Sequence, residues 1–387
     1  MDVAIVAPCP VPYARGGAEN LWRGLQDHLN ERTPHQAEIL KLPSREHSFW
    51  ELLDSYRAFA ALDLTGFDVV VSGKYPAWMV DHPAHVVYLL HPLRGLYDIY
   101  PFFGLPPTPP DPPAFVAELL EFLERNAGRR DALQELWERL EHLRTLVASL
   151  PGELFAFPGA LIRVLIHWLD RVGMDPSRIK RYGAISATVR DRDGYFPAGE
   201  DVFVVHPPAH RTIVPGGRRG DYVFTVSRLD AAKRLDILVE AMGLVRSGAR
   251  LKLAGTGTEA ARLAELSAGN ERVELLGRVS DAALDGLYGG ARAVAFLACN
   301  EDFGLVALEA MQSGRPVITC RDSGGPRELV EDGVTGLVVD PTAEAVAAAI
   351  DELWADRSRW RRMGQAGQLR ARDVSWDPLV EQLVGAA

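Results

Sequence analysis

The sequence predicts an α/β protein built from two doubly wound domains, and three observations support this prediction. The chain has 387 residues, which exceeds the roughly 250 to 300 residues over which one hydrophobic core usually grows. Short apolar runs alternate with helical stretches over residues 2–90 and again over 222–339, as in parallel sheets covered by helices. The hydrophobic share of 47% and charged share of 24% provide enough apolar material for two cores.

The first series of elements begins at the N-terminus. Residues 2–7 form an apolar run, and a loop with Gly16 and Gly17 leads into a predicted helix over residues 20–29. A strand followed by a glycine loop and a helix is the repeating unit of a doubly wound sheet. We therefore predict an N-terminal Rossmann-like domain over residues 1–212. Its further strands are expected at 37–42, 69–72 and 86–90.

The strand and helix alternation stops at a predicted insertion over about residues 104–169. Residues 105–113 are rich in proline, which predicts an extended connection. Residues 131–150 place apolar side chains at helical spacing. Residues 154–169 are apolar but contain Arg163 and His167, and we expect a helix that covers a cleft, with a membrane-surface helix as the alternative. No run reaches the roughly 18 apolar residues expected of a membrane-spanning helix.

The second series of elements predicts a C-terminal Rossmann-like domain over residues 213–370, entered through a hinge at 214–221. Residues 371–387 are predicted to form a final helix. In two doubly wound domains joined in this way, a ligand is expected in the crevice at the carboxyl ends of the strands. The expected strands are 222–226, 250–254, 272–275, 293–297, 316–319 and 336–339.

Charge and cysteine content narrow the class of protein. The formal net charge of -10 argues against nucleic acid as a partner, which requires a basic face. The three cysteines, Cys9, Cys299 and Cys320, lie far apart, so neither a disulfide framework nor a zinc cluster is expected. The apolar start without a basic leader predicts a cytoplasmic protein with at most peripheral membrane contact.

Residues 300–311 are the strongest candidate for a functional site. A strand ends, a loop carries Glu301, and a helix is predicted to begin near Gly304. The unpaired N–H groups and the dipole at a helix start favour an anion, and glycine permits close approach of the backbone. Glu309 lies one to two turns into this helix. We therefore expect an anionic ligand here, with one carboxylate near a reacting centre and one near a ribose.

The segment from Asn300 to Gly325 resembles the E-x7-E motif of family 4 retaining glycosyltransferases, with Glu301 and Glu309 as the two glutamates. The resemblance extends over residues 222–387. It implies the GT-B fold, in which two Rossmann-like domains face a central cleft and the final helix, near Trp376, crosses back to the N-terminal domain. It also implies a hexosyltransferase that uses a nucleotide sugar.

The resemblance implies a role for each matching residue. A basic pair, Arg228 and Lys233, is expected to grip the donor diphosphate and to stabilise the charge of the leaving group. Glu301 is expected to hold the sugar, and Glu309 the ribose. The catalytic candidates are Glu301, His91, Arg228 and Lys233; the donor-binding candidates are Gly16, Gly17, Gly255, Gly257, Phe303, Gly304, Leu305 and Glu309; the acceptor-side candidates are Arg94 and Lys74.

A finer resemblance concerns residues 91–98, with Asp170-Arg171 and residues 206–208. These stretches are similar to a branch that contains O-antigen mannosyltransferases. The resemblance implies GDP-mannose or a UDP-sugar as donor, an acceptor hydroxyl of unknown identity, transfer with retention, and neither a metal nor a cofactor.

Three alternatives remain open. Residues 255–260 fit a G-x-G-x-x-A pattern after a strand, and Glu274 follows, which is typical of nicotinamide-dependent oxidoreductases, although there the pattern follows the first strand of the domain. A non-catalytic nucleotide-sugar-binding module would share the same fold. Finally, Asp191-Arg192-Asp193 matches the D-x-D metal motif, but no strand precedes it, and a surface charge cluster is the preferred interpretation.

Overall fold

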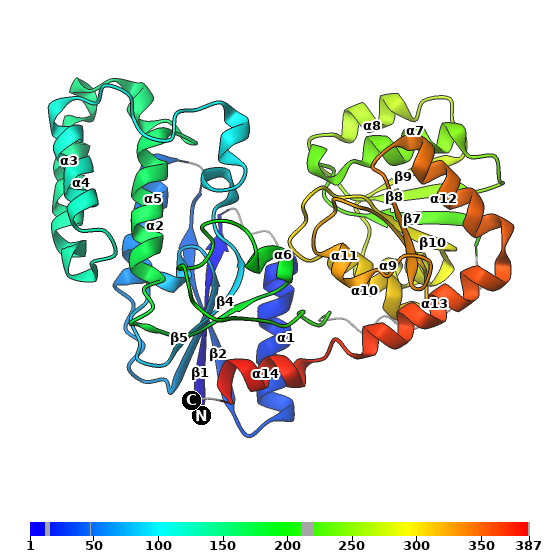
Figure 1. Ribbon diagram of the computed structural model, residues 1–387, viewed down its shortest axis with the longest axis horizontal. Helices are drawn as coiled ribbons and strands as arrows, with labels where there is room; N and C mark the ends of the chain where they lie inside the picture. The colour runs from blue at the N-terminus through cyan, green and yellow to red at the C-terminus, as the bar shows by residue number, and fades with distance from the viewer. Residues whose placement is uncertain (12–15, 47, 210–219, 386–387) are drawn as a thin grey trace. The chain divides into compact units, whose positions relative to one another are not determined.

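The computed structural model describes residues 1–11, 16–46, 48–209 and 220–385. Their contacts divide the chain into two compact units, which are described separately. Unit 1 consists of Met1–Ile185, Val189–Val205 and Trp376–Ala387, and unit 2 of Ser186–Thr188 and His206–Ser375. In the described part of the chain, each unit contains one six-stranded sheet whose strands pair in parallel (Figure 1).

The sheet of unit 1 has the strand order β2-β1-β3-β4-β5-β6. Its central strands are buried on both faces and therefore consist of nearly continuous apolar runs, such as Val3–Val6 and Val86–Leu90. The strands are β1 (Asp2–Pro10), β2 (Gln36–Ser44), β3 (Val69–Lys74), β4 (His85–His91), β5 (Ile179–Ala184) and β6 (Val202–Val204).

The helices of unit 1 follow the predicted series, including helical segments within the insertion. The α-helices are α1 (Gly17–Arg32), α2 (Phe49–Ala60), α3 (Ala114–Arg125), α4 (Leu133–Leu146), α5 (Ala160–Gly173), α6 (Ala187–Arg190), which crosses the unit boundary, and α14 (Trp376–Val384). The 3-10 helices are η1 (Ala77–Met79), η2 (Arg94–Leu96), η3 (Tyr100–Phe103), η4 (Arg130–Ala132), η5 (Val147–Ser149) and η6 (Gly152–Phe155).

The insertion forms a group of three α-helices, α3, α4 and α5 (Figure 1). The guanidinium group of Arg139 on α4 lies 4.6 Å from the ring centre of Phe122 on α3, and the Phe122 ring lies 6.4 Å from Trp168 on α5. Residues 105–113 contain neither helix nor strand, as their prolines predict, but bends at residues 107, 108, 110 and 111 show that the connection is not extended throughout.

The apolar stretch before α5 differs from its prediction. A continuous α-helix begins at Ala160, later than expected, and a 3-10 turn precedes it. By length and composition Gly152–Gly173 is apolar enough to cross a membrane, with a mean hydropathy of 1.3, so the expectation that no segment reaches that length was wrong. The 14 residues of α5 span about 21 Å, less than the roughly 30 Å of a bilayer core.

The sheet of unit 2 has the strand order β12-β11-β10-β7-β8-β9. Its strands are β7 (Tyr222–Val226), β8 (Arg250–Ala254), β9 (Val273–Gly277), β10 (Ala293–Phe296), β11 (Val317–Cys320) and β12 (Gly336–Val339). Its helices are η7 (Ala231–Lys233), α7 (Leu235–Leu244), α8 (Ala260–Leu266), α9 (Asp281–Gly290), α10 (Leu305–Gln312), α11 (Pro326–Leu329), α12 (Ala343–Ala355) and α13 (Arg357–Arg372).

The predicted domain boundary between residues 212 and 213 lies outside the described residues, as does most of the predicted hinge. At the other end of the chain, α14 belongs to unit 1. His28 of α1 lies 3.2 Å from the carboxylate of Asp377, and the carbonyl of Gln382 accepts a hydrogen bond from Arg181 on β5. The last helix therefore packs within the N-terminal unit.

Candidate active site

The candidate site of unit 2 lies at the point where the order of strand addition reverses, between β7 and β10. From β7 the chain adds β8 and β9 on one side, and β10 then pairs with the other side of β7. The loops after β7 and β10 therefore leave the sheet in opposite directions, and ligands of doubly wound sheets bind at this point. A backbone hydrogen bond of 2.8 Å from Cys299 N–H to the Ala232 carbonyl connects the two loops.

Lys233 and Glu301 meet at this point. The Lys233 ammonium group donates a hydrogen bond of 2.5 Å to Glu301, and the two side chains are 14% and 26% exposed. The same ammonium group lies 5.7 Å from the ring centre of Phe296, at the end of β10. The structure thus brings together a predicted diphosphate-binding cation and the predicted sugar-binding carboxylate, which lie 68 positions apart in the sequence.

Backbone hydrogen bonds fix the loop that carries Glu301. The Glu301 N–H donates to the Ser323 carbonyl at 2.8 Å, and the Glu301 carbonyl accepts from the Gly325 N–H at 2.9 Å. A Cβ atom at Gly325 would lie 2.5 Å from the Cα atom of Phe303, so a side chain there would force the two segments apart. The glycines after β11 therefore permit the contact that positions Glu301.

Gly304 caps α10 in the left-handed conformation, with φ 89°. A Cβ atom at this position would lie 2.5 Å from Cγ of Pro326, so both the backbone conformation and the contact favour glycine. Leu305 is the first residue of α10, and the first N–H groups of a helix have no partner within the helix. The predicted helix start is therefore formed, three residues after Glu301, while anion binding there stays a prediction.

Glu309 lies in the second turn of α10 and is half-buried. The hydroxyl of the buried residue Tyr288, on α9, donates a hydrogen bond of 2.6 Å to Glu309. This contact holds one carboxylate oxygen in place. Glu309 belongs to the same helix as Gly304, as predicted, while its role toward a ribose stays a prediction.

Arg228 lies at the surface of unit 2. Its side chain is 79% exposed and lies 3.2 Å from Asp230, and its expected role toward the diphosphate stays a prediction. Arg234, which follows Lys233, forms two hydrogen bonds of 2.7 Å with Asp322. Arg234 is not among the residues selected from the sequence, although its position next to Lys233 could have indicated it.

Gly255 and Gly257 lie beside the loop after β7. A Cβ atom at Gly255 would lie 1.9 Å from the Ser227 carbonyl oxygen, and one at Gly257 would lie 2.5 Å from that of Leu229. Both glycines therefore allow the loop that leads to Lys233 to pack against the end of β8. Their role in binding the donor stays a prediction.

In unit 1, two of the candidates lie on adjacent strands. Lys74 ends β3, His91 ends β4, and the two residues are paired in the sheet register. The ammonium group of Lys74 lies 3.7 Å from Glu46, and Nδ1 of His91 lies 2.8 Å from the Pro92 carbonyl, to which it donates. The carboxyl ends of these strands thus place a cation and an imidazole close together.

The other candidates in unit 1 are Gly16, Gly17 and Arg94. Gly16 is the N-cap of α1 and donates its N–H to Glu19 at 2.9 Å. Gly17 begins α1. The loop residues 12–15 lie outside the described residues. Arg94 binds Asp98 with its shortest contact at 2.6 Å.

Residues 216–370 match the family described as "Glycosyl transferases group 1". This region, here called the group 1 region, contains Lys233, Glu301, Gly304 and Glu309. The D-inositol 3-phosphate glycosyltransferase of Salinispora tropica is 31% identical over 233 residues, 56% of this chain and 47% of that protein. The protein of the same name from Nocardia farcinica is 35% identical over 227 residues, 53% of this chain and 48% of that protein.

The chain thus spans about half the length of the curated relatives that it matches. Among solved structures, HepE of Anabaena, crystallised with UDP and glucose, has a TM-score of 0.63 and 15% identity, covering 100% of both chains. Sucrose-phosphate synthase of Thermosynechococcus elongatus has a TM-score of 0.62 and 17% identity, also covering 100% of both chains. These similarities confirm the predicted fold class, the GT-B fold with two Rossmann-like domains.

Two sequence patterns suggested other classes of protein, and the structure shows the surroundings of both. The G-x-G-x-x-A pattern follows β8, while the first strand of this sheet is β7. Glu274 pairs with Lys252 on the neighbouring strand at 3.3 Å. Outside the group 1 region, Asp191 of the D-x-D triplet is 62% exposed and paired with Arg190. Among the described residues, no group of three or more His, Cys, Asp or Glu side chains could hold a metal ion.

Glu328, another residue of the group 1 region, is not among the candidates selected from the sequence. Its carboxylate accepts hydrogen bonds from the N–H groups of Ala187 and Thr188, at 2.8 and 2.7 Å, and contacts His206 at 3.0 Å. Burial alone would raise the pKa of Glu328, but the hydrogen bonds from His206 and Thr188 lower it to about 2. Glu328 therefore anchors two segments that are remote in sequence.

The Glu328→Gln substitution is expected to destabilise the protein by about 2 kcal/mol at neutral pH, because hydrogen bonds to a charged acceptor are lost. Since the folded-state pKa lies below the usual value of 4.5, this stabilisation is present above pH 4.5 and is lost as the pH falls toward 2. Urea unfolding at several pH values should show that the two proteins converge in acid. A difference that does not change with pH would contradict this account.

Proposed function

We propose that the chain is a glycosyltransferase that moves a hexosyl group from a nucleotide diphosphate sugar to an acceptor hydroxyl. The main observation behind this proposal is the Lys233–Glu301 pair at the ends of β7 and β10 in unit 2, near the Gly304 cap of α10. Support comes from the match of residues 216–370 to group 1 glycosyl transferases and from the UDP and glucose in the HepE crystals.

The proposed chemistry assigns a task to each of these groups. The bond between the anomeric carbon and the diphosphate oxygen breaks, and the diphosphate keeps the electron pair. The Lys233 ammonium group and the first N–H groups of α10 stabilise the growing negative charge. Glu301 accepts hydrogen bonds from sugar hydroxyls, and Glu309 from the ribose. Arg228, which is exposed, would have to turn from Asp230 toward the diphosphate.

Retention completes the proposal. The acceptor oxygen bonds to the anomeric carbon on the face that the diphosphate leaves, and its proton passes to a diphosphate oxygen. Since Lys233 supplies positive charge at the leaving group, we propose that the reaction needs no metal. GDP-mannose or a UDP-sugar is the proposed donor, within the family 4 retaining enzymes.

Binding of a nucleoside diphosphate tests this proposal directly. We expect GDP or UDP to raise the melting temperature of the full chain, with a stabilisation of about 2.7 kcal/mol at 100 times the dissociation constant. NAD, the ligand of the alternative oxidoreductase class, should leave the melting temperature unchanged. Stabilisation by NAD without any effect of GDP or UDP would overturn the assignment.

A panel of nucleotide sugars separates the enzyme from a non-catalytic binding module. We expect at least one donor to be hydrolysed slowly or transferred, with release of free nucleoside diphosphate, and the active donor to identify the base and the sugar. Nuclear magnetic resonance of the product then reports whether the anomeric configuration is retained. Tight binding of a donor without any turnover would favour the binding module.

A further inference from the structure

Unit 1 contains two hollows that share the helix α5. The larger, of about 600 Å³, lies between α3, α5 and the proline-rich segment; its apolar lining includes Pro109, Leu120, Leu123 and Trp168. The smaller, of about 290 Å³, is lined by aromatic side chains that include Trp78, Tyr97, Tyr195 and Phe196. His167 and Arg171 line both hollows. Sizes of this order suit small organic ligands.

Three residues four positions apart, Arg163, His167 and Arg171, lie on one face of α5; we call them the α5 face. The guanidinium group of Arg171, an exposed residue, forms no hydrogen bond or ion pair within the described part of the chain. Arg163 donates to the Pro107 carbonyl at 3.3 Å, but its Nε atom is buried without a partner among the described residues. The α5 face thus presents one unpaired guanidinium group and one incompletely paired group.

The wall of the larger hollow contains a further unsatisfied donor. Trp168 is 4% exposed, and its indole Nε1 has no hydrogen-bond partner among the described residues. Buried donors without partners are uncommon and usually indicate a water, an ion or a ligand. The carboxylate that lines this hollow is Glu124, which belongs to an exposed residue. Two arginines and one glutamate leave a net positive charge around it.

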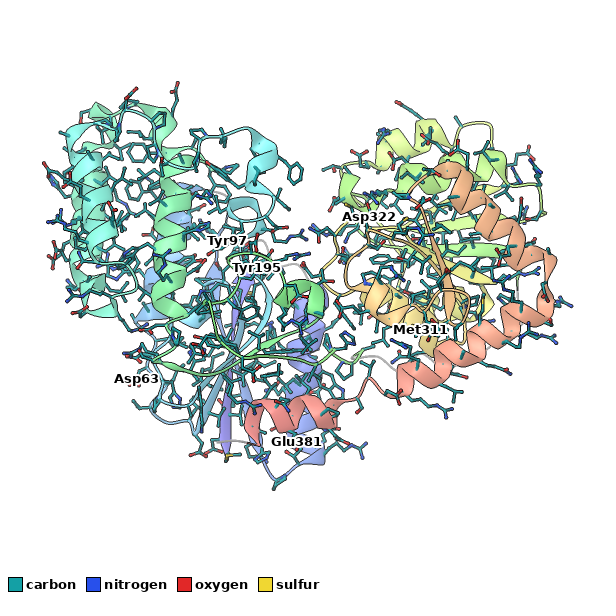
Figure 2. The ribbon with its side chains drawn as sticks, in the orientation of Figure 1. Asp63, Tyr97, Tyr195, Met311, Asp322 and Glu381 are labelled. Carbon is teal, nitrogen blue, oxygen red and sulfur yellow. The ribbon has the colours of Figure 1, made fainter. Side chains whose placement is uncertain are left out.

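The smaller hollow has the opposite character. Its carboxylate, Asp170, is 5% exposed and accepts hydrogen bonds from Tyr56, Trp78 and Tyr97 at 2.7, 2.8 and 2.6 Å. A ligand anion placed here would lie near a like charge. Tyr97 and Tyr195, both labelled in Figure 2, contact each other edge to face at 6.0 Å, and such aromatic walls suit a ring.

His167 lines both hollows. Its Nε2 atom lies 2.8 Å from the Leu96 carbonyl, which accepts, so Nε2 carries the proton. Burial lowers the pKa of His167 to about 4, and its ring stacks on Tyr97 at 4.1 Å. Nδ1 of the neutral ring is therefore an acceptor that suits a ligand hydroxyl.

We propose that the two hollows bind the acceptor of the reaction, and that this acceptor carries a hydroxyl-bearing ring and an anionic group, a carboxylate or a phosphate ester. The proposal rests on the proposed transfer function. The anionic group binds Arg171 and Arg163 in the larger hollow, and the ring occupies the smaller hollow with its hydroxyl near His167. Pro92, which lines the smaller hollow, follows His91 at the end of β4, so this hollow lies beside the carboxyl end of that strand.

The test compares binding of small probes of one shape to the full chain by isothermal titration calorimetry. The probes are para-hydroxybenzoate and para-hydroxyphenyl phosphate, the neutral para-hydroxybenzyl alcohol, and benzoate, which lacks the hydroxyl. We expect the hydroxylated anions to bind at least about tenfold more tightly than the neutral alcohol, since one such charge-assisted contact contributes about 1.5 to 3 kcal/mol. The stronger of the two anions identifies the preferred anionic group.

Single substitutions test which side chain binds the anionic group of the probes and which binds the hydroxyl. Arg171→Ala should weaken binding of the hydroxylated anions by about tenfold and leave the neutral alcohol unchanged. Arg125→Ala, at the exposed end of α3, is the matched control and should bind like the wild type. His167→Phe should abolish the preference for para-hydroxybenzoate over benzoate. Equal binding of anion and alcohol, no effect of Arg171→Ala, or no binding of any probe at millimolar concentration would overturn the proposal.

Failure of this inference and failure of the transfer function are distinguishable. GDP or UDP binding depends on unit 2 and should persist in Arg171→Ala. If a nucleoside diphosphate stabilises the protein while the aromatic anions do not bind, the acceptor inference is wrong and the donor site stands. If the anions bind and neither GDP nor UDP does, the hollows hold an anion, but the proposed transfer function is wrong.

Discussion

Replacing Lys233 with alanine is expected to lower the transfer rate by about 10²- to 10³-fold, the cost of removing one preorganised group that stabilises developing charge. The Lys233 side chain is only 14% exposed, and its ammonium group already lies against Glu301, so alanine leaves this position without a positive charge. The rate constant for a single turnover with the active donor measures the effect. The affinity for nucleoside diphosphate should fall as well.

A neighbouring ion pair provides the matched control. Lys252 and Glu274 lie 3.3 Å apart on β8 and β9 of the same unit, so Lys252→Ala removes the same kind of side chain and charge away from the ends of β7 and β10. We expect this variant to turn over like the wild type, with circular dichroism confirming that both variants are folded. Equal activity of Lys233→Ala and Lys252→Ala would show that Lys233 has no part in transfer.

Glu301→Gln separates binding from chemistry at the same pair. Removing the carboxylate charge releases Lys233, so nucleoside diphosphate should bind at least as tightly as in the wild type, whereas transfer should fall because the sugar loses its charged acceptor. The corresponding control is Glu274→Gln. Weaker diphosphate binding in Glu301→Gln would indicate that Glu301 holds the nucleotide rather than the sugar.

The second large effect is expected at Asp170, on stability. Asp170→Ala removes the common acceptor of three buried donors, on Tyr56, Trp78 and Tyr97. Leaving buried donors unsatisfied costs roughly 1 to 3 kcal/mol each, so we expect a loss of about 4 kcal/mol in the free energy of unfolding. Tyr97→Phe, which removes one of the three bonds, should cost about 1 to 2 kcal/mol. Urea denaturation measures both.

The contribution of Asp170 to the free energy of unfolding is expected to depend on pH. Burial raises the pKa of Asp170 to about 6, although the hydrogen bonds from the tyrosines and the tryptophan oppose the change. The folded chain therefore holds this proton at pH values where the unfolded chain has released it, and the contribution of Asp170 to stability falls as the pH rises from 4 to 6. Asp170→Asn lacks this dependence. Its free energy of unfolding, relative to that of the wild type, should therefore rise by up to about 3 kcal/mol between pH 4 and 6.

The local pattern around Glu301 could be predicted from the sequence because its parts are neighbours in the chain. A strand end, a glycine at the helix start and a glutamate in the second turn lie within a dozen positions, and the structure places Gly304 and Glu309 on one helix as expected. The alternation of apolar runs predicted the sheets for the same reason, since strand burial on both faces leaves a continuous apolar run.

Contacts between remote segments could not be predicted in this way. Nothing near Glu328 indicates that its partners are Thr188 and His206, because such pairing depends on how the segments fold together. Asp170 follows an apolar helical run, and its three donors lie 114, 92 and 73 positions away. The contact between Arg228 and Asp230 likewise could not be predicted from the residue types alone.

The parallel pairing of β7 with β10 also has a consequence for folding. Strands β8 and β9 lie between β7 and β10 in the sequence. The contact between β7 and β10 therefore closes a long loop, which costs chain entropy. Lys233 and Glu301 follow these two strands in the chain, so we expect them to meet only when the strands have paired. Nucleotide binding during refolding should therefore appear late, and a fragment that ends before Ala293 would contain the complete loop after β7 without the ability to bind.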